Sequence, residues 1–246
     1  MIIPLSGTKH RRRIYLMRHG EVSYFNTDGT PVKEPNLVKL TSEGREQANL
    51  MRKMLNGVHF DRAVHSGLTR TKETLQRVLG DQKVVIEKVP ELIEVQPKSY
   101  ISIPESRRET ELVYAFENAH QEGASYGNGE LFTDFSKRIL QAFNMFLKRD
   151  DWSSLLIVAH DGVNRILLSI ATSNCFNDSK SALKNMGGFD QDPCCLNIID
   201  VDVVHKKAEL ARVKALNLTP KNVIKQENQL SSMEQIFKPY AMTYVS

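Results

Sequence analysis

Short apolar segments alternate with amphipathic segments along this chain, and this alternation limits the folds that it can adopt. Six segments rich in apolar and β-branched residues are predicted as strands: residues 14–17, 60–65, 83–89, 154–159, 195–203 and 210–216. Four segments with apolar residues at helical spacing are predicted as helices: residues 41–55, 68–78, 135–146 and 163–171. Strands separated by helices indicate an α/β fold, a three-layer α/β/α sandwich around a mostly parallel sheet.

Two segments depart from this alternation. Residues 96–130 contain two prolines, a charged helical piece at about 105–121 and a glycine-rich turn, which is typical of an insertion that covers the sheet. Residues 220–246 form a polar tail whose pattern favours no particular structure. We expect one domain over residues 1–246, with residues 96–130 as a helical cap.

The composition of the chain indicates which kinds of molecule it can bind and in which compartment it is found. The net charge of +4 suits anionic small molecules but is too small to indicate nucleic acid binding. No apolar stretch approaches the length of about 18 residues that a membrane span requires. The three cysteines, Cys175, Cys194 and Cys195, form no disulfide pattern, so we expect reduced thiols and a cytoplasmic protein. The oligomeric state is left open, with a dimer as one assembly that the sequence allows.

Polar residues that can carry chemistry follow four of the predicted strands. His19 follows the first strand, Ser66 and Arg70 follow the second, Glu94 lies beyond the third, and His160 directly follows residues 154–159. In open α/β sheets, ligands bind at the carboxyl ends of the strands. We therefore expect these side chains to meet at one edge of the sheet.

Five motifs occur in a fixed order around these residues. They are Arg18-His19-Gly20-Glu21, Leu40-Thr41-Ser42-Glu43-Gly44-Arg45-Glu46-Gln47-Ala48, Ser66-Gly67-Leu68-Thr69-Arg70-Thr71-Lys72-Glu73-Thr74, Leu92-Ile93-Glu94 and Ala159-His160-Asp161-Gly162. Each motif alone is a weak signal. Together and in this order, over residues 14 to about 170, they resemble the histidine phosphatase superfamily in its phosphoglycerate-mutase-like branch.

The resemblance implies a phosphohistidine mechanism. His19 would attack phosphorus, and an imidazole is largely neutral at pH 7 because its reference pKa is about 6.5. Arg18 and Arg70 would hold the phosphoryl oxygens, and a protonated His160 would add a further hydrogen bond. Glu94 would protonate the leaving oxygen and then activate water. The scheme requires no metal and no cofactor.

Other positions at the expected site have less certain roles. Gly20 is expected to let the substrate approach the backbone near the phosphate. Asp161, where the family often has glycine, is expected to cap the following helix and could also orient the histidine before it or contact the leaving group. Ser66 is either a helix N-cap or a residue at the rim. The family often has asparagine at the position of Phe25, and Asn26, one residue later, could take that role.

The leading hypothesis is a metal-independent phosphatase that hydrolyses a small phosphorylated metabolite. A mutase that moves phosphate between hydroxyl groups and a phospho-ligand or protein-binding module with weak turnover are the alternatives. Glu105 or Glu109 could replace Glu94 as the acid. Three cationic residues of the insertion could bind a second anionic group of the substrate or could form a solvated surface: Lys98, Arg107 and Arg108. A metal site built from His19, His160 and Asp161 is disfavoured because the neighbouring arginines would repel a cation.

Overall fold

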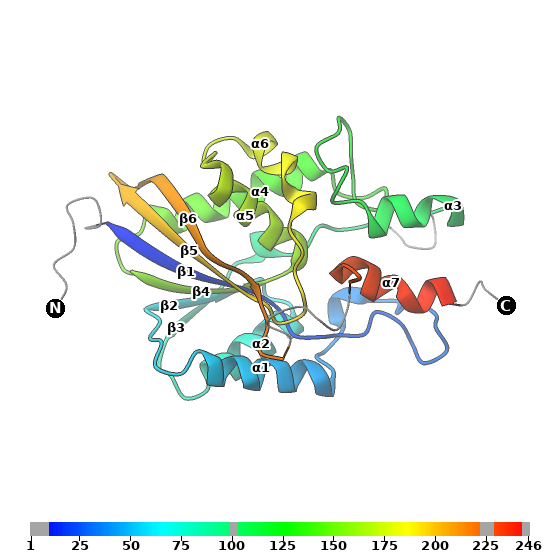
Figure 1. Ribbon diagram of the computed structural model, residues 1–246, viewed down its shortest axis with the longest axis horizontal. Coiled ribbons are helices and arrows are strands. Elements are labelled where there is room, and N and C mark those ends of the chain that lie inside the picture. The colour runs from blue at the N-terminus through cyan, green and yellow to red at the C-terminus, as the bar shows by residue number, and fades with distance from the viewer. Residues whose placement is uncertain (1–9, 99–102, 222–228, 243–246) are drawn as a thin grey trace.

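The computed structural model describes residues 10–98, 103–221 and 229–242, and it confirms the α/β fold around one six-stranded sheet (Figure 1). The strands are β1 (Arg11–Arg18), β2 (Arg62–His65), β3 (Val85–Lys88), β4 (Ser154–Ala159), β5 (Leu196–Val204) and β6 (Lys207–Leu218). Their order in the sheet is β3-β2-β4-β1-β5-β6. The pairs β3-β2, β2-β4 and β4-β1 are parallel, whereas β5 is antiparallel to both β1 and β6.

Helices cover both faces of this sheet (Figure 1). The helices are α1 (Ser42–Met54), α2 (Thr69–Leu79), α3 (Glu105–Arg108), α4 (Phe132–Leu147), α5 (Asp161–Ser173), α6 (Ser179–Lys184) and α7 (Ser232–Met242). Short 3-10 segments are η2 (Pro35–Leu37), η3 (Pro90–Leu92) and η5 (Met186–Gly188), and η4 (Glu109–Val113) is π-helical. Helices α1 and α2 lie on one face, and α4, α5 and α6 lie on the other.

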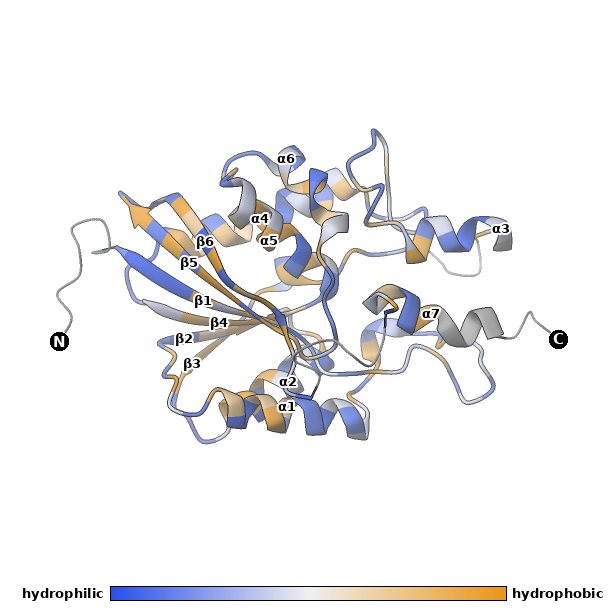
Figure 2. Cartoon of the chain, in the orientation of Figure 1, coloured by the Kyte–Doolittle hydropathy of each residue, from blue (hydrophilic) through white to orange (hydrophobic). Residues whose placement is uncertain are grey.

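The sheet separates two hydrophobic clusters because successive side chains of a strand point to opposite faces. In β4, Leu155 and Ile157 pack into the cluster that includes α4 and α5, whereas Leu156 and Val158 pack into the cluster that includes α1 and α2. The central strands are therefore hydrophobic on both sides, while α1 alternates between hydrophobic and hydrophilic residues (Figure 2). This burial fixes the register that brings the carboxyl ends of the parallel strands together.

The insertion at residues 96–130 contains less regular helix than the sequence predicts. Within the expected helical piece at about 105–121, α3 and η4 end at Val113, and turns follow. The turns are closed by short backbone hydrogen bonds such as that from Tyr126 N to Glu130 O at 3.1 Å. Residues 99–102 of the insertion lie outside the described residues.

The polar tail contains a helix that the sequence analysis did not predict. Helix α7 lies beyond the carboxyl ends of the parallel strands (Figure 1) and packs against η4 of the insertion. Its apolar residues Met233, Ile236 and Phe237 are spaced as on one face of a helix. This spacing is the sequence pattern from which the helix could have been predicted. The tail's residues 222–228 and 243–246 lie outside the described part of the chain. None of the described helices is both long enough and apolar enough to cross a membrane.

Candidate active site

The backbone of His19 is held at the centre of the sheet. Arg18 is the last residue of β1, and the next amide, His19 N, donates to Ala159 O of β4 at 3.1 Å. On the other side, Cys194 N donates to His19 O at 2.9 Å. His19 is only 3% exposed. The strand ends thus fix the position of the histidine from both sides.

The side chain of His19 has a defined tautomer. Its Nδ1 lies 2.7 Å from the carbonyl oxygen of Gly20, which can only accept, so Nδ1 carries the hydrogen. Nε2 then carries the lone pair, and Arg70 Nε donates to it at 3.3 Å. Burial, followed by the charges of Arg70 and Arg18, holds the pKa of His19 well below its ordinary value. The imidazole is therefore neutral at pH 7, with Nε2 as the nucleophilic nitrogen.

Two buried guanidinium groups lie beside this histidine. Arg70, on the first turn of α2, also donates through Nη1 to Pro35 O at 3.1 Å. Arg18 donates through Nη1 to the carbonyl oxygen of Gln191. Both side chains are less than 5% exposed. Since guanidinium groups remain charged at any physiological pH, the pair forms a permanent positive site suited to phosphoryl oxygens.

His160 lies against His19, with ring centroids 5.2 Å apart and an interplanar angle of 68°. Its Nε2 is 2.9 Å from Ser66 Oγ, so Ser66 contacts the histidine. The N-cap of α2 is Leu68, and the interpretation of Ser66 as that cap is wrong. Burial and the charge of Arg70 hold the pKa of His160 well below its ordinary value. The protein alone therefore favours neutral His160, and the expected protonated form requires the negative charge of a phosphate.

Glu94 lies in the loop after η3, facing the start of α5. Its Oε1 accepts from Val95 N at 2.9 Å, and its Oε2 accepts from Gly162 N at 3.0 Å. A Cβ at Gly162 would lie 2.6 Å from the carboxylate, so glycine permits this approach. Burial, followed by the negative charge of Asp161, raises the pKa of Glu94. A carboxyl group in this environment retains its proton more readily, as a general acid requires.

Asp161 does not cap α5, and that prediction is wrong: the N-cap is His160, and Asp161 is the first helical residue. Its buried carboxylate pairs with Arg165, lies 3.4 Å from Arg18 Nη1 and accepts from Ser232 Oγ at 2.7 Å. Although burial opposes ionisation, Arg165 and Arg18 hold the pKa of Asp161 below its ordinary value. Asp161 thus orients one guanidinium group of the site rather than the neighbouring histidine.

Close packing against α1, rather than a place in the cavity, explains why position 20 requires glycine. The Gly20 amide donates to Thr74 Oγ1 at 3.0 Å, and a Cβ would lie 2.5 Å from Gly44 O. Gly20 is not among the residues that line the cavity, so the expected role beside the phosphate is not supported. Asn26 also fails to take the expected position, because its amide donates to Thr30 Oγ1 at 2.9 Å in the exposed loop. Asn36 lines the cavity instead.

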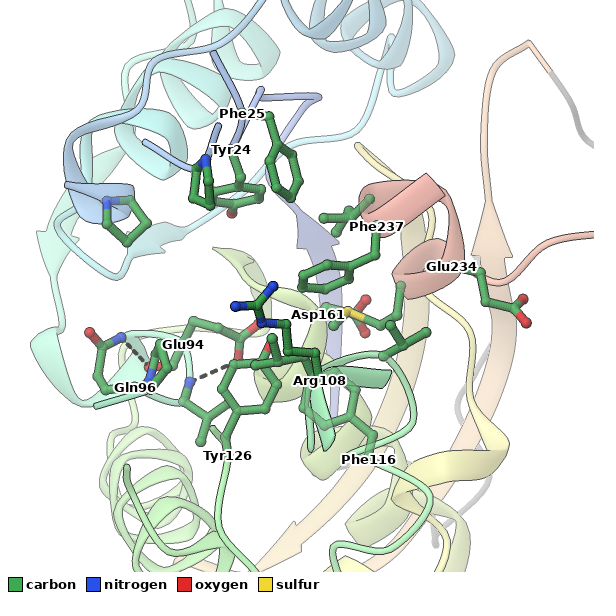
Figure 3. Close-up of a pocket in the computed structure, with 18 of the residues that line it drawn as sticks. Tyr24, Phe25, Glu94, Gln96, Arg108, Phe116, Tyr126, Asp161, Glu234 and Phe237 are labelled. Atoms are coloured by element: carbon green, nitrogen blue, oxygen red, sulfur yellow. Dashed lines mark hydrogen bonds between the residues drawn. The ribbon is translucent and has the colours of Figure 1, made fainter. Parts of the chain in front are cut away.

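A cavity of about 540 Å³ opens in front of these groups (Figure 3). The catalytic candidates Arg18, His19, Arg70, Glu94 and Asp161 line one end. The remaining wall is mostly aromatic and aliphatic, and includes Tyr24, Phe25, Leu112, Phe116, Tyr126, Met233, Ile236 and Phe237. This wall could not be predicted from the sequence, because its residues come from parts of the chain that are far apart: the loop after β1, the insertion and α7. His160 is not among the lining residues, and its buried ring packs against the ring of His19.

The insertion contributes polar groups unevenly. Arg108 and Glu109 line the cavity, whereas Arg107 pairs with Glu111 and its side chain is 60% exposed. Lys98 is also exposed. The side chain of Glu105, the other alternative acid, lies outside the described part of the chain. Among the described residues, no group of three or more His, Cys, Asp or Glu side chains could hold a metal ion.

The family model of the histidine phosphatase superfamily (branch 1) matches residues 14–214. The chain belongs to this family. The match covers the strands and motifs described above and confirms the resemblance drawn from them. The chain is a phosphoric monoester hydrolase of the histidine phosphatase type, in agreement with relatives that are named phosphatases.

One relative is the adenosylcobalamin/alpha-ribazole phosphatase of Escherichia coli, 29% identical over 162 residues, or 64% of this chain and 77% of that protein. The crystal structure of the alpha-ribazole phosphatase from Shigella flexneri is similar, with a TM-score of 0.65 and 28% identity over 83% of this chain and 96% of that chain. A mycobacterial glucosyl-3-phosphoglycerate phosphatase has a TM-score of 0.65 at 18% identity, covering 84% of this chain and 99% of that one, and shows the fold alone.

Proposed function

We propose that this histidine phosphatase hydrolyses a small phosphomonoester without a metal ion, through a phosphohistidine on His19. The observation that carries the proposal is the neutral imidazole of His19, whose Nε2 faces Arg70 Nε at 3.3 Å. A lone pair held beside a permanent positive charge suits attack on an anionic phosphorus centre.

In the first step, His19 Nε2 forms a bond to phosphorus while the ester O–P bond breaks. Glu94 gives its proton to the leaving oxygen. In the second step, the ionised Glu94 takes a proton from water as the water oxygen bonds to phosphorus and the N–P bond breaks. Inorganic phosphate leaves, and Glu94 again holds its proton. One carboxyl group therefore serves as acid and then as base.

The positive groups stabilise the charge that moves through both steps. Arg18 and Arg70 hold the equatorial oxygens of the transferring group. A bound phosphate dianion would raise the pKa of His160, which then donates a further hydrogen bond. Positioning and electrostatic stabilisation of this kind supply most of the catalysis in phosphoryl transfer.

Hydrolysis is favoured over transfer to a second hydroxyl because the curated relatives reported above are named phosphatases. A mutase and a phospho-ligand or protein-binding module remain as distinct outcomes of the test below. We also propose that the protein is cytoplasmic, supported by three cysteines without disulfides. The proposal that it binds neither nucleic acid nor membrane is supported by the small net charge of +4 and by a sequence without a long apolar stretch. Cell fractionation with a membrane marker tests the location, and sedimentation velocity tests the oligomeric state.

The experiment measures p-nitrophenyl phosphate hydrolysis in EDTA for the wild type, His19→Ala and His120→Ala. His120 is an exposed histidine of the insertion and serves as the matched control. We expect full activity in the control and a fall of at least about 10⁴-fold in His19→Ala. Rapid alkaline quench with ³²P-labelled substrate is expected to trap alkali-stable, acid-labile label on the wild type and on His120→Ala, and none on His19→Ala.

Glu94→Gln separates the two steps. Because p-nitrophenolate leaves without a proton, the variant is expected to form the phosphoenzyme and hydrolyse it slowly, giving a burst of product. Label that passes to an added hydroxyl acceptor rather than to water would indicate a mutase. Phosphate binding without label or turnover on a panel of phosphomonoesters would indicate a binding module and reject the phosphatase proposal.

A further inference from the structure

The cavity extends well beyond the groups that a phosphoryl group can occupy. Its volume of about 540 Å³ lies in the range of sites that bury a whole small molecule, of the order of 300–1,000 Å³. The additional space is enclosed by three parts of the chain: the loop at residues 24–36, residues 95–97 and 108–126 in and next to the insertion, and the C-terminal residues 230–237. The leaving group of the substrate must occupy this space.

Aromatic rings form two opposite sides of that space (Figure 3). Phe116 and Tyr126 stack with centroids 5.8 Å apart and an interplanar angle of 16°. Phe25 meets Phe237 edge to face at 6.2 Å and 78°. Tyr24 lies beside Phe25 in the same view. Rings arranged in this way favour a flat apolar group between them.

Charged groups in the outer cavity do not favour a second phosphate. Away from the catalytic end, the described lining residues with formal charge are Arg108, Glu109 and Glu234. One cation and two carboxylates give this part of the lining no excess of positive charge for a second phosphate. Arg107, the neighbouring cation, pairs with Glu111. The proposal of a second anion-binding group in the insertion is therefore disfavoured.

Helix α7 is held firmly enough to act as part of this wall. Its first residue, Ser232, donates through Oγ to Asp161 Oδ2 at 2.7 Å and through N to Asp190 Oδ1 at 2.9 Å. On the same first turn, Glu234 Oε1 accepts from Tyr114 OH of the insertion at 3.0 Å. The helix is thus attached both to the catalytic end and to the insertion, with Phe237 facing the cavity.

We infer that the cavity selects phosphomonoesters of bulky aromatic alcohols, and that Met233 and Phe237 of α7 determine this specificity. The inference rests on the proposed function and names its substrate class. The catalytic groups hold the phosphoryl group at one end, while the aromatic walls bury the alcohol. Burial of a phenyl-sized group is expected to improve binding about 10- to 100-fold.

The test compares 2-phenylethyl phosphate with ethyl phosphate, since both release a primary alcohol of similar basicity and differ in the ring. We expect kcat/KM to be about 10- to 100-fold higher for the phenyl ester. Calorimetry with 2-phenylethylphosphonate and ethylphosphonate, which cannot be hydrolysed, is expected to show the same preference in Kd. Tight selective binding without turnover would reject the proposed function but support the aromatic pocket.

Substitutions in α7 test whether Met233 and Phe237 cause the preference for the phenyl ester. Met233→Ala and Phe237→Ala are each expected to lower kcat/KM about 5- to 20-fold for the phenyl ester and less than about 2-fold for ethyl phosphate. Met145→Ala, an exposed methionine of α4, and Gln235→Ala, on α7 but outside the cavity lining, are the controls. Equal affinity of the wild type for both phosphonates, or equal losses on both esters in the α7 variants, would overturn the inference.

Discussion

The hydroxyl of Ser232 donates a 2.7 Å hydrogen bond to Oδ2 of Asp161, and this contact joins the C-terminal helix to the catalytic end of the cavity. The same carboxylate oxygen lies 3.4 Å from Arg18 Nη1. A residue near position 230 and the arginine that precedes His19 therefore share one buried anion. Docking of α7 and the orientation of Arg18 are coupled through Asp161.

Ser232→Ala is expected to lower the free energy of unfolding by about 1–3 kcal/mol, because a buried carboxylate loses a hydrogen bond. Hydrogen exchange at residues 229–242 is expected to become faster, since Ser232 holds the start of α7. Ser153→Ala, at an exposed serine, is the control and should leave both quantities unchanged. Unchanged exchange in α7 of the Ser232 variant would show that this contact does not hold the helix.

Gly20→Ala is expected to destabilise the fold by about 1–3 kcal/mol or more, because the added Cβ would lie 2.5 Å from the backbone oxygen of Gly44. Neither backbone can move freely, since Gly44 itself has Glu21 O within 2.2 Å of its own Cβ position. Urea denaturation measures the loss. Gly188→Ala is the matched control, because no atom lies within 4 Å of its Cβ position. Equal stability of the two variants would refute the packing role.

Much of the sheet and the catalytic end could be predicted from local sequence. Apolar strands such as Ser154–Ala159 end abruptly at polar residues, and parallel strand ends must meet at one edge. His19, Arg70, Glu94 and His160 were therefore found from their places after strands. His19, Arg70 and Glu94 line one cavity, and His160 contacts the ring of His19. Their roles remain predictions for the experiments above.

The rest depended on contacts between segments distant in sequence. Ser66 reads locally as a cap, but its hydroxyl contacts His160, 94 positions later. The local sequence suggests that Gly20 makes room for the ligand. In the structure, glycine is required there because a Cβ would collide with the backbone of Gly44 in α1. The aromatic wall requires α7 to fold back over the carboxyl ends of the strands, and no local pattern near residue 232 specifies that position.

The pH dependence of stability should show opposite signs for Glu94 and His19. Because folding raises the pKa of Glu94, its protonated carboxyl group stabilises the folded state. This contribution to the free energy of unfolding is complete below pH 4.5 and is lost as the pH rises through the folded-state pKa. We expect the wild type to lose stability relative to Glu94→Gln over that rise, by at most about 1.4 kcal/mol per pH unit. Urea unfolding of both proteins from pH 4.5 to 8 measures the difference.

Because folding lowers the pKa of His19, its neutral ring stabilises the folded state. This contribution to the free energy of unfolding is complete above pH 6.5 and is lost as the pH falls through the folded-state pKa. The wild type is therefore expected to lose stability relative to His19→Asn below pH 6.5. His120→Asn, at an exposed position, controls for removal of a histidine. A difference between wild type and His19→Asn that does not vary with pH would show that His19 is not held neutral by burial.

Arg138 is expected to position Glu94 without touching the substrate. It donates through Nη1 to Ile93 O at 2.7 Å and through Nη2 to Glu94 O at 3.2 Å, and it pairs with Glu130 at 2.7 Å. Because the guanidinium fixes the backbone that carries the acid, Arg138→Met is expected to lower kcat about 10-fold or more for esters that need a proton on the leaving oxygen. Hydrolysis of p-nitrophenyl phosphate should show no loss in its burst phase, since that leaving group needs no acid. Arg77→Met, which removes a partly exposed ion pair with Glu73 on α2, is the control. Equal losses in the burst phase and with the alkyl esters would indicate general misfolding rather than displacement of Glu94.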